Sequence, residues 1–151
     1  MSAYRQILYH IIFRTKCSEA TICQEHVSCL YKYIWGIIKN NKCTLYRING
    51  IEDHIHILSD LHPSVALANY VRDIKVASSK WMKASGYFPD FKGWGIKYCA
   101  LTYSFQEKDN LIHYIKNQQE HHKIESFKDE IKRLFKEQGI EQDEKWFWVD
   151  E

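Results

Sequence analysis

The first forty residues change from strand-like to helix-like spacing of apolar side chains. From Ile7 to Phe13 every second residue is aliphatic or aromatic, which is the period of a half-buried strand. Residues 22–39 then carry apolar side chains at helical spacing, behind Thr21-Ile22-Cys23-Gln24, which has the form of a capping box. The chain is therefore expected to begin with a strand and an amphipathic helix.

Two more apolar runs, residues 43–48 and 53–59, flank Asn49-Gly50. This dipeptide takes positive φ readily and favours tight turns. We expect the two runs to pair as a β-hairpin that turns at Asn49-Gly50.

The rest of the chain predicts three helices and one strand. Their signals are apolar residues at three- and four-residue steps, capping residues, and glycines that end a helix. The expected elements are a helix after Ser64 with apolar residues from Leu67 to Trp81, a strand over residues 96–103, a helix from the capping box Ser104-Phe105-Gln106-Glu107 to about His121, and a helix from Ser126 to Gly139. The aromatic tail at residues 146–148 is expected to dock on the body or on a partner.

This order of elements favours an α+β fold built as one domain over residues 1–151. The expected architecture is a four-stranded antiparallel sheet with helices on one face, a ferredoxin-like or RRM-like sandwich. Its second face would then be open for a ligand or partner.

Composition narrows the class of protein. Five cysteines without a CxxC pair favour neither a disulfide framework nor a structural zinc site, and they suit a reducing compartment. A leader and an apolar run long enough to span a membrane are both missing, so a cytoplasmic protein is expected. Net charge is only +2, so any affinity for nucleic acid must come from local clusters of charge.

Two pairs of residues carry candidate chemistry. His54 and His56 alternate on an expected strand, so both imidazoles share one face and one divalent cation can bridge them. Tyr114 and Gln118 lie four apart on an expected helix, which stacks a nucleophile and an amide on one face. Each pair also has an ordinary structural interpretation, and spacing alone does not bring the two pairs together.

Several stretches together resemble the single-tyrosine HUH transposases of small insertion sequences. His54-Ile55-His56 resembles their HUH motif, and residues 114–122 resemble their nucleophile helix. Further stretches resemble their first strand and second helix, namely His10 to Lys16, Val71 to Lys75, and Ser78 to Trp81. The resemblance covers nearly the whole chain in order.

The resemblance implies an HUH endonuclease fold, a homodimer, and a Mg²⁺ or Mn²⁺ site made by His54, His56 and Gln118. It implies that Tyr114 cleaves and rejoins single-stranded DNA at hairpin-containing element ends, through a 5′-phosphotyrosine intermediate. In such dimers the tyrosine helix of one subunit often serves the metal site of the other. Lys97 and Cys99 stand where the family usually carries small residues, which keeps open an inactive copy that binds DNA without cutting it.

Other residues are weaker candidates. Arg72, Lys75 and Lys83 form a stripe that could follow a DNA backbone, although a solvated helix face explains it equally well. His10 and His121 are candidates for contacts to the metal's ligands or to a phosphate.

Two other classes of function share part of this pattern. A histidine-triad hydrolase would need a third histidine at Leu58, and a two-histidine phosphoesterase would need two separate His-x-Ser/Thr pairs. A non-catalytic module for single-stranded nucleic acid could stack bases on Tyr9 or Tyr103 across an open sheet. It would leave the histidine, tyrosine and glutamine set without a role.

Overall fold

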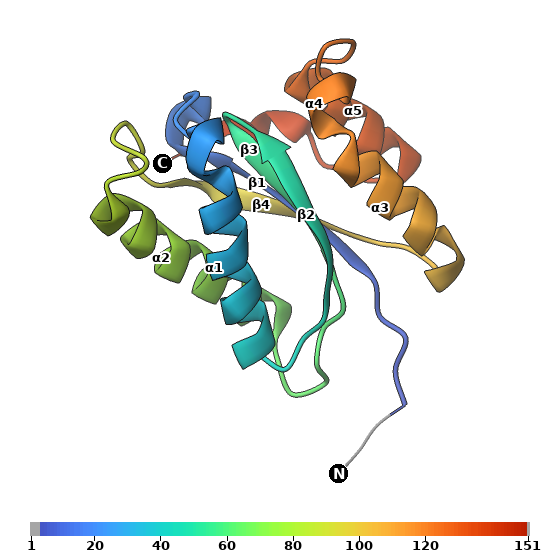
Figure 1. Ribbon diagram of the computed structural model, residues 1–151. Coiled ribbons are helices and arrows are strands. Elements are labelled where there is room, and N and C mark those ends of the chain that lie inside the picture. The colour runs from blue at the N-terminus through green and yellow to red at the C-terminus, as the bar shows by residue number, and fades with distance from the viewer. Residues whose placement is uncertain (1–3, 151) are drawn as a thin grey trace.

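Four antiparallel strands form the central sheet of the computed structural model, which describes residues 4–150 (Figure 1). They lie in the order β2-β3-β1-β4, the order of a ferredoxin-like sheet. The strands are β1 (Tyr9–Thr15), β2 (Leu45–Ile51), β3 (His54–Ser59) and β4 (Trp94–Thr102). The α-helices are α1 (Val27–Asn40), α2 (Leu67–Ser85), α3 (Lys108–Lys116), α4 (Gln118–His121) and α5 (Phe127–Glu137). The α+β fold with a four-stranded antiparallel sheet is thus confirmed.

Helices α1 and α2 cover one face of the sheet and enclose the larger apolar core (Figure 1). Ile11 and Phe13 of β1 share this face with Ile55 and Ile57 of β3, and all four are fully buried. The period-two spacing of the first strand therefore correctly predicted its apolar side.

The opposite face was expected to be open, and this expectation is wrong. Helices α3, α4 and α5 lie on it (Figure 1). Two smaller apolar clusters join them to the sheet, one around Ile12 with Ile131 and one around Leu58 with Ile115. Apolar side chains project from both faces of the strands. Exposing either face to water would therefore lower the stability of the fold.

The hairpin turn also differs from its prediction. Asn49-Gly50 lies inside β2, where Asn49 pairs with His56, and the strands are joined at Glu52 and Asp53. Gly50 is required here for space, because a Cβ would overlap the backbone of His54.

Helix starts were predicted with mixed success. The capping box at Thr21 is not formed, and a short 3-10 turn (Gln24–His26) precedes α1. Ser64 and Ser104 likewise do not cap a helix through their side chains. Ser126 does, since its hydroxyl accepts a hydrogen bond from Asp129 N at the start of α5.

The aromatic tail docks on the body of the molecule. It forms a 3-10 segment (Glu144–Trp148) whose Phe147 is buried in the cluster beneath α5. Asp150, two residues after the end of this segment, accepts hydrogen bonds from both terminal nitrogens of the buried Arg14 guanidinium (2.8 and 2.9 Å). The tail therefore closes one end of the sheet's second face.

No helix within residues 4–150 is long and apolar enough to cross a membrane.

Candidate active site

The two histidines of β3 point away from the larger core, toward helices α3 to α5. Alternation along the strand sends Ile55 and Ile57 into that core and turns His54 and His56 to the other face. Both imidazoles are fully buried, with ring centroids 5.0 Å apart. The prediction that they share one face is confirmed.

A neighbour holds one ring nitrogen of each histidine. His54 Nδ1 donates to Asp53 Oδ1 (2.7 Å), and His56 Nδ1 lies 2.7 Å from His10 Nε2. Within residues 4–150 the Nε2 atoms of His54 and His56 have no hydrogen-bond partner. Metal-binding histidines are commonly oriented in this way, with one nitrogen held and the other free.

Glu130 of α5 brings a buried carboxylate to the same point. Its Oε1 lies 3.7 Å from His54 Nε2, 3.3 Å from His56 Nε2 and 3.2 Å from the Nε2 of His122. This oxygen has no hydrogen-bond partner within the described residues. Three imidazoles and a carboxylate that converge in a buried place fit a divalent cation, since burying such groups without a counter-charge or ligand is costly.

Tyr114 and Gln118 reach the same cluster from two different helices. The expected single helix is broken at Asn117, between α3 and α4. The Tyr114 hydroxyl donates to Glu130 Oε2 and accepts from Arg133 Nη2 (2.9 Å). Gln118 accepts from His122 Nε2 (2.8 Å) and donates to Glu130 Oε2 (3.3 Å). The fold therefore brings together the two residue pairs that sequence spacing could not connect.

Asn49 fixes this tyrosine segment to the sheet. Its amide nitrogen donates to the carbonyls of Ile115 (2.9 Å) and Lys116 (3.0 Å), which lie at the end of α3. Gln119 in turn donates to Asn49 Oδ1 and to the Gly50 carbonyl (both 2.9 Å). Carbonyls at a helix end need partners from outside the helix, and Asn49 supplies them where the helix breaks.

Burial sets the protonation of the buried groups. It lowers the pKa of His54 to about 4 and, with the help of His56, the pKa of His10 well below its ordinary value. Burial and the Glu130 carboxylate raise the pKa of Tyr114, although Arg133 opposes the shift. Tyr114 is thus a phenol at neutral pH, and the imidazoles of His10 and His54 are neutral.

Glu130 remains ionised in spite of its surroundings. Burial works to raise the pKa of its carboxyl, but the imidazoles of His56, His122 and His54 outweigh burial and hold the pKa below the usual range. Burial also works to lower the pKa of His122, and there the nearby Glu130 carboxylate prevails and raises the pKa. Glu130 is accordingly the negative centre of the cluster.

A small cleft of about 180 Å³ gives access to Tyr114. His10, Tyr103 and Arg133 help to line it. The candidate His121 lies at the other side of the tyrosine, with its Nε2 2.7 Å from Glu125 Oε1 and 3.5 Å from Glu130 Oε2. Both candidates therefore lie beside the cluster. His10 contacts His56, and His121 lies close to Glu130.

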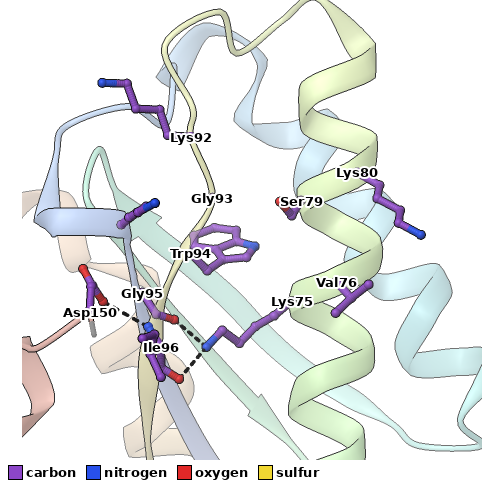
Figure 2. Close-up of a pocket in the computed structure, with 11 residues that line it drawn as sticks. Lys75, Val76, Ser79, Lys80, Lys92, Gly93, Trp94, Gly95, Ile96 and Asp150 are labelled. Carbon is purple, nitrogen blue, oxygen red and sulfur yellow. Dashed lines mark hydrogen bonds between the residues drawn. The ribbon is translucent and has the colours of Figure 1, made fainter.

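The basic stripe lies elsewhere. Arg72, Lys75 and Lys83 belong to α2, which packs on the face opposite the histidines. Lys75 points into a cleft of about 580 Å³ and donates to the carbonyls of Gly95 (2.6 Å) and Ile96 (3.0 Å), as Figure 2 shows. Lys75 is thus engaged within the chain, whereas Arg72 and Lys83 are exposed.

Glu130 and His122 were missed by sequence analysis, although Glu130 leaves a trace in the sequence. It lies three residues after Phe127 and four before Leu134, so it occupies the apolar face of α5. A carboxylate in such a position needs a buried partner. His122 gives no comparable signal, because its role depends on the turn that follows α4.

The departures from the family pattern are accommodated by the fold. Cys99 is buried in the cluster with Ile12 and Ile131, and Lys97 is exposed on the edge strand β4.

The chain is similar to known transposases. Residues 3–118 match the family model described as "Transposase IS200 like". The ISDra2 transposase TnpA of Deinococcus radiodurans is 26% identical over 120 residues, which cover 75% of this chain and 84% of that protein.

Solved structures agree on the fold. A crystal structure of a candidate transposase from Deinococcus radiodurans R1 has a TM-score of 0.58 and 25% identity, and covers 78% of this chain and 95% of that chain. A REP-associated tyrosine transposase bound to a REP hairpin has a TM-score of 0.59 and 15% identity, and covers 81% of this chain and 74% of that chain. The family match spans most of the chain and includes both histidines of β3 and Tyr114. The chain therefore belongs to the IS200-like transposase family.

Proposed function

We propose that this transposase cleaves and rejoins single-stranded DNA, with Tyr114 as nucleophile and with His54 and His56 binding a divalent metal ion. One observation carries the proposal. The Tyr114 hydroxyl contacts one oxygen of Glu130, while the free Nε2 atoms of His54 and His56 face the other. Nucleophile and metal site therefore lie on the two sides of a single buried carboxylate.

The chemistry begins with attack of Tyr114 Oη on a DNA phosphorus atom. The P–O3′ bond breaks as the new P–O bond forms, which gives a 5′-phosphotyrosine and a free 3′-hydroxyl. Because the ester keeps the energy of the phosphodiester, a 3′-hydroxyl of another strand can attack it, release the tyrosine and join new DNA without ATP.

The residues around Tyr114 assist its deprotonation. Glu130 Oε2 accepts the hydrogen bond of the Tyr114 hydroxyl and is placed to take its proton. Arg133 donates to the Tyr114 hydroxyl oxygen and stabilises negative charge as it develops there. A bound Mg²⁺ or Mn²⁺ would polarise a phosphate oxygen and neutralise developing charge. The resemblance names Gln118 as a third ligand beside His54 and His56, and its amide lies at the site next to two stronger donors, His122 and Glu130.

The DNA partner is proposed to be a strand with hairpin-containing ends. The REP-associated relative is described bound to a hairpin, which supports this choice. Arg72 and Lys83 remain candidates for backbone contacts, and a strand that touched both them and Tyr114 would have to pass around an edge of the sheet. A cytoplasmic location is proposed with this role.

A homodimer is also proposed, as the resemblance implies. Tyr114 lies beside His56 of its own chain and contacts Glu130 of its own chain, so we expect each subunit to hold a complete site. Mixing Tyr114→Phe protein with His54→Ala protein tests this. No recovery of cleavage under verified subunit exchange is expected, and recovery would show that sites are shared.

A non-catalytic binding module is the second candidate and has less support. Tyr9 packs against the larger core, and Tyr103 packs against the clusters beneath α3 and α5. The open aromatic platform on which that function depends is therefore covered within the described residues. An inactive copy of the transposase would bind DNA as the proposed enzyme does but would not cleave it.

The deciding experiment is a denaturing gel of the protein with labelled single-stranded DNA from the regions that flank its gene. The reactions contain Mn²⁺, a chelator, or the Tyr114→Phe variant. A label that migrates with the protein only when metal and Tyr114 are both present supports the transposase. Binding without an adduct would favour the binding module or the inactive copy.

A further inference from the structure

We propose that the metal centre of this chain is made by three imidazoles and one carboxylate, from His54, His56, His122 and Glu130, and that Gln118 is a positioning residue beside it. The inference deepens the proposed function, since it assigns the ligands of the metal that the reaction would use. It differs from the ligand set that the resemblance implies, in which the glutamine completes the site.

The orientation of the three rings is the first argument. Each has its Nδ1 held by a different neighbour, namely Asp53 for His54, His10 for His56, and the Glu125 carbonyl for His122 (3.0 Å). Holding Nδ1 fixes the ring and aims Nε2. Carboxylates and backbone carbonyls commonly hold metal-binding histidines in this way.

The common target of the three rings is the second argument. All three Nε2 atoms lie within 3.7 Å of Glu130 Oε1, and one nitrogen from each ring and one Glu130 oxygen lie within 4.8 Å of one another. Two of these nitrogens and this oxygen are buried without a hydrogen-bond partner among residues 4–150. Four donors at such spacing can close around one cation with small side-chain movements.

Gln118 is bound differently. Its amide oxygen accepts from His122 Nε2 and its amide nitrogen donates to Glu130 Oε2, so both ends of the amide face proposed ligands. A cation at Glu130 Oε1 would displace the Nε2 proton of His122 to solvent, because a ligand nitrogen must be unprotonated. Gln118 would keep its hydrogen bond to Glu130 and so hold the carboxylate in place.

This donor set changes the expected metal. Mg²⁺ prefers oxygen ligands and water, whereas imidazoles favour later transition metals such as Zn²⁺. Calorimetric titration of the metal-free full chain should give a dissociation constant for Zn²⁺ roughly 100-fold or more below that for Mg²⁺. Equal affinities would contradict a centre with three imidazoles.

Cobalt(II) titration separates ligands from positioning residues, because the visible absorption of bound Co²⁺ reports its donors. Glu130→Gln and His122→Gln should each weaken binding by roughly 100-fold and change the spectrum at saturation. Gln118→Ala should weaken binding by about 10-fold and leave that spectrum unchanged. Glu137→Gln is the matched control, since Glu137 lies exposed on the same helix and, among residues 4–150, forms an ion pair only with Arg133.

The opposite pattern would overturn the proposal. If Gln118→Ala alters the saturated spectrum and Glu130→Gln does not, the glutamine is the ligand. Circular dichroism of each metal-free variant checks that it folds.

The unaltered chain offers a second test that needs no variant. In ¹⁵N-histidine NMR, saturation with Zn²⁺ should shift the Nε2 resonances of three of the eight histidines together. A shift of only two would refute the proposal. Neither test contains DNA, so an inactive copy that no longer cleaves DNA would still give the predicted metal spectra. The proposed ligand set and the proposed DNA cleavage can therefore fail separately.

Discussion

The two faces of the sheet use the same strands for different purposes. On the face under α1 and α2, β1 and β3 contribute aliphatic and aromatic side chains to one apolar core. On the face under α3 to α5, alternate residues of the same strands bury His10, Arg14, His54 and His56. Burying polar groups lowers stability unless each finds a partner. Arg14 finds one in Asp150, whereas the Nε2 atoms of His54 and His56 have none within residues 4–150, which the proposed metal site would explain.

The sharpest comparison comes from two adjacent residues of β3, one on each face. His56→Ala should lower the rate of adduct formation about 1,000-fold or more, because a lost metal site removes several kcal/mol of transition-state stabilisation. The rate of covalent protein–DNA adduct formation in Mn²⁺ measures this. A variant that still forms the adduct at the normal rate would remove His56 from the site.

Ile57→Ala should show the opposite behaviour. Ile57 is fully buried in the larger core, so truncation should lower the free energy of unfolding by about 2–5 kcal/mol. Urea denaturation measures that loss, and the adduct rate at a temperature where the variant is folded should stay near normal. A large loss of rate in folded Ile57→Ala protein would mean that the two faces are not separable.

Acid should destabilise the polar face of the metal-free protein. The pKa of His54, which faces Asp53, His56 and Glu130, falls to about 4 in the folded state, and that of His10 is also lowered. The unfolded chain binds these protons near pH 6.5, so the contribution of these two imidazoles to stability is constant above that pH. Stability falls as pH drops below about 6.5, for His54 until about pH 4, by on the order of 1.4 kcal/mol per pH unit.

His122 does not reverse this trend. Its pKa is raised, so its stabilising effect is fully present below about pH 6.5 and is lost only as pH rises. Urea midpoints between pH 7 and 4.5 measure the slope, with His54→Asn expected to reduce it. A flat profile would show that the imidazoles are accessible to protons in the folded state.

The smallest expected effect concerns the outer surface of α2. Lys83→Ala should leave stability within about 0.5 kcal/mol of the parent, because Lys83 is exposed. If the DNA backbone contacts this helix, a plot of log affinity against log salt concentration should be less steep for Lys83→Ala than for the parent, by about one unit. An unchanged slope would restrict DNA binding to the other surfaces.

The role of a residue could be predicted from the sequence where it follows from the residue's own neighbours in the chain. Parity on β3 placed His54 and His56 on one face, and the resemblance added Tyr114. The role could not be predicted where it depends on contacts with residues far away in the sequence. Asn49-Gly50 has the local preference of a turn, yet Asn49 is held in β2 by carbonyls of α3 that follow far along the chain.

Glu130 shows the same limit more clearly. Spacing places it on the apolar face of α5, but only the fold shows that this face meets two histidines of β3 and the tyrosine of α3. The expected open face failed for the same reason, since the helices that cover it are joined to the sheet by contacts between residues far apart in sequence.

The late position of α5 in the chain has a consequence for synthesis on the ribosome. The histidine pair is made early, but Glu130 and Arg133, which hold Tyr114 in place, leave the ribosome only after every strand and the tyrosine itself. A growing or prematurely released chain that ends before α5 would carry the histidines and the tyrosine without the groups that anchor them. If the chain cleaves DNA as proposed, cleavage is therefore expected only after the protein is almost fully made.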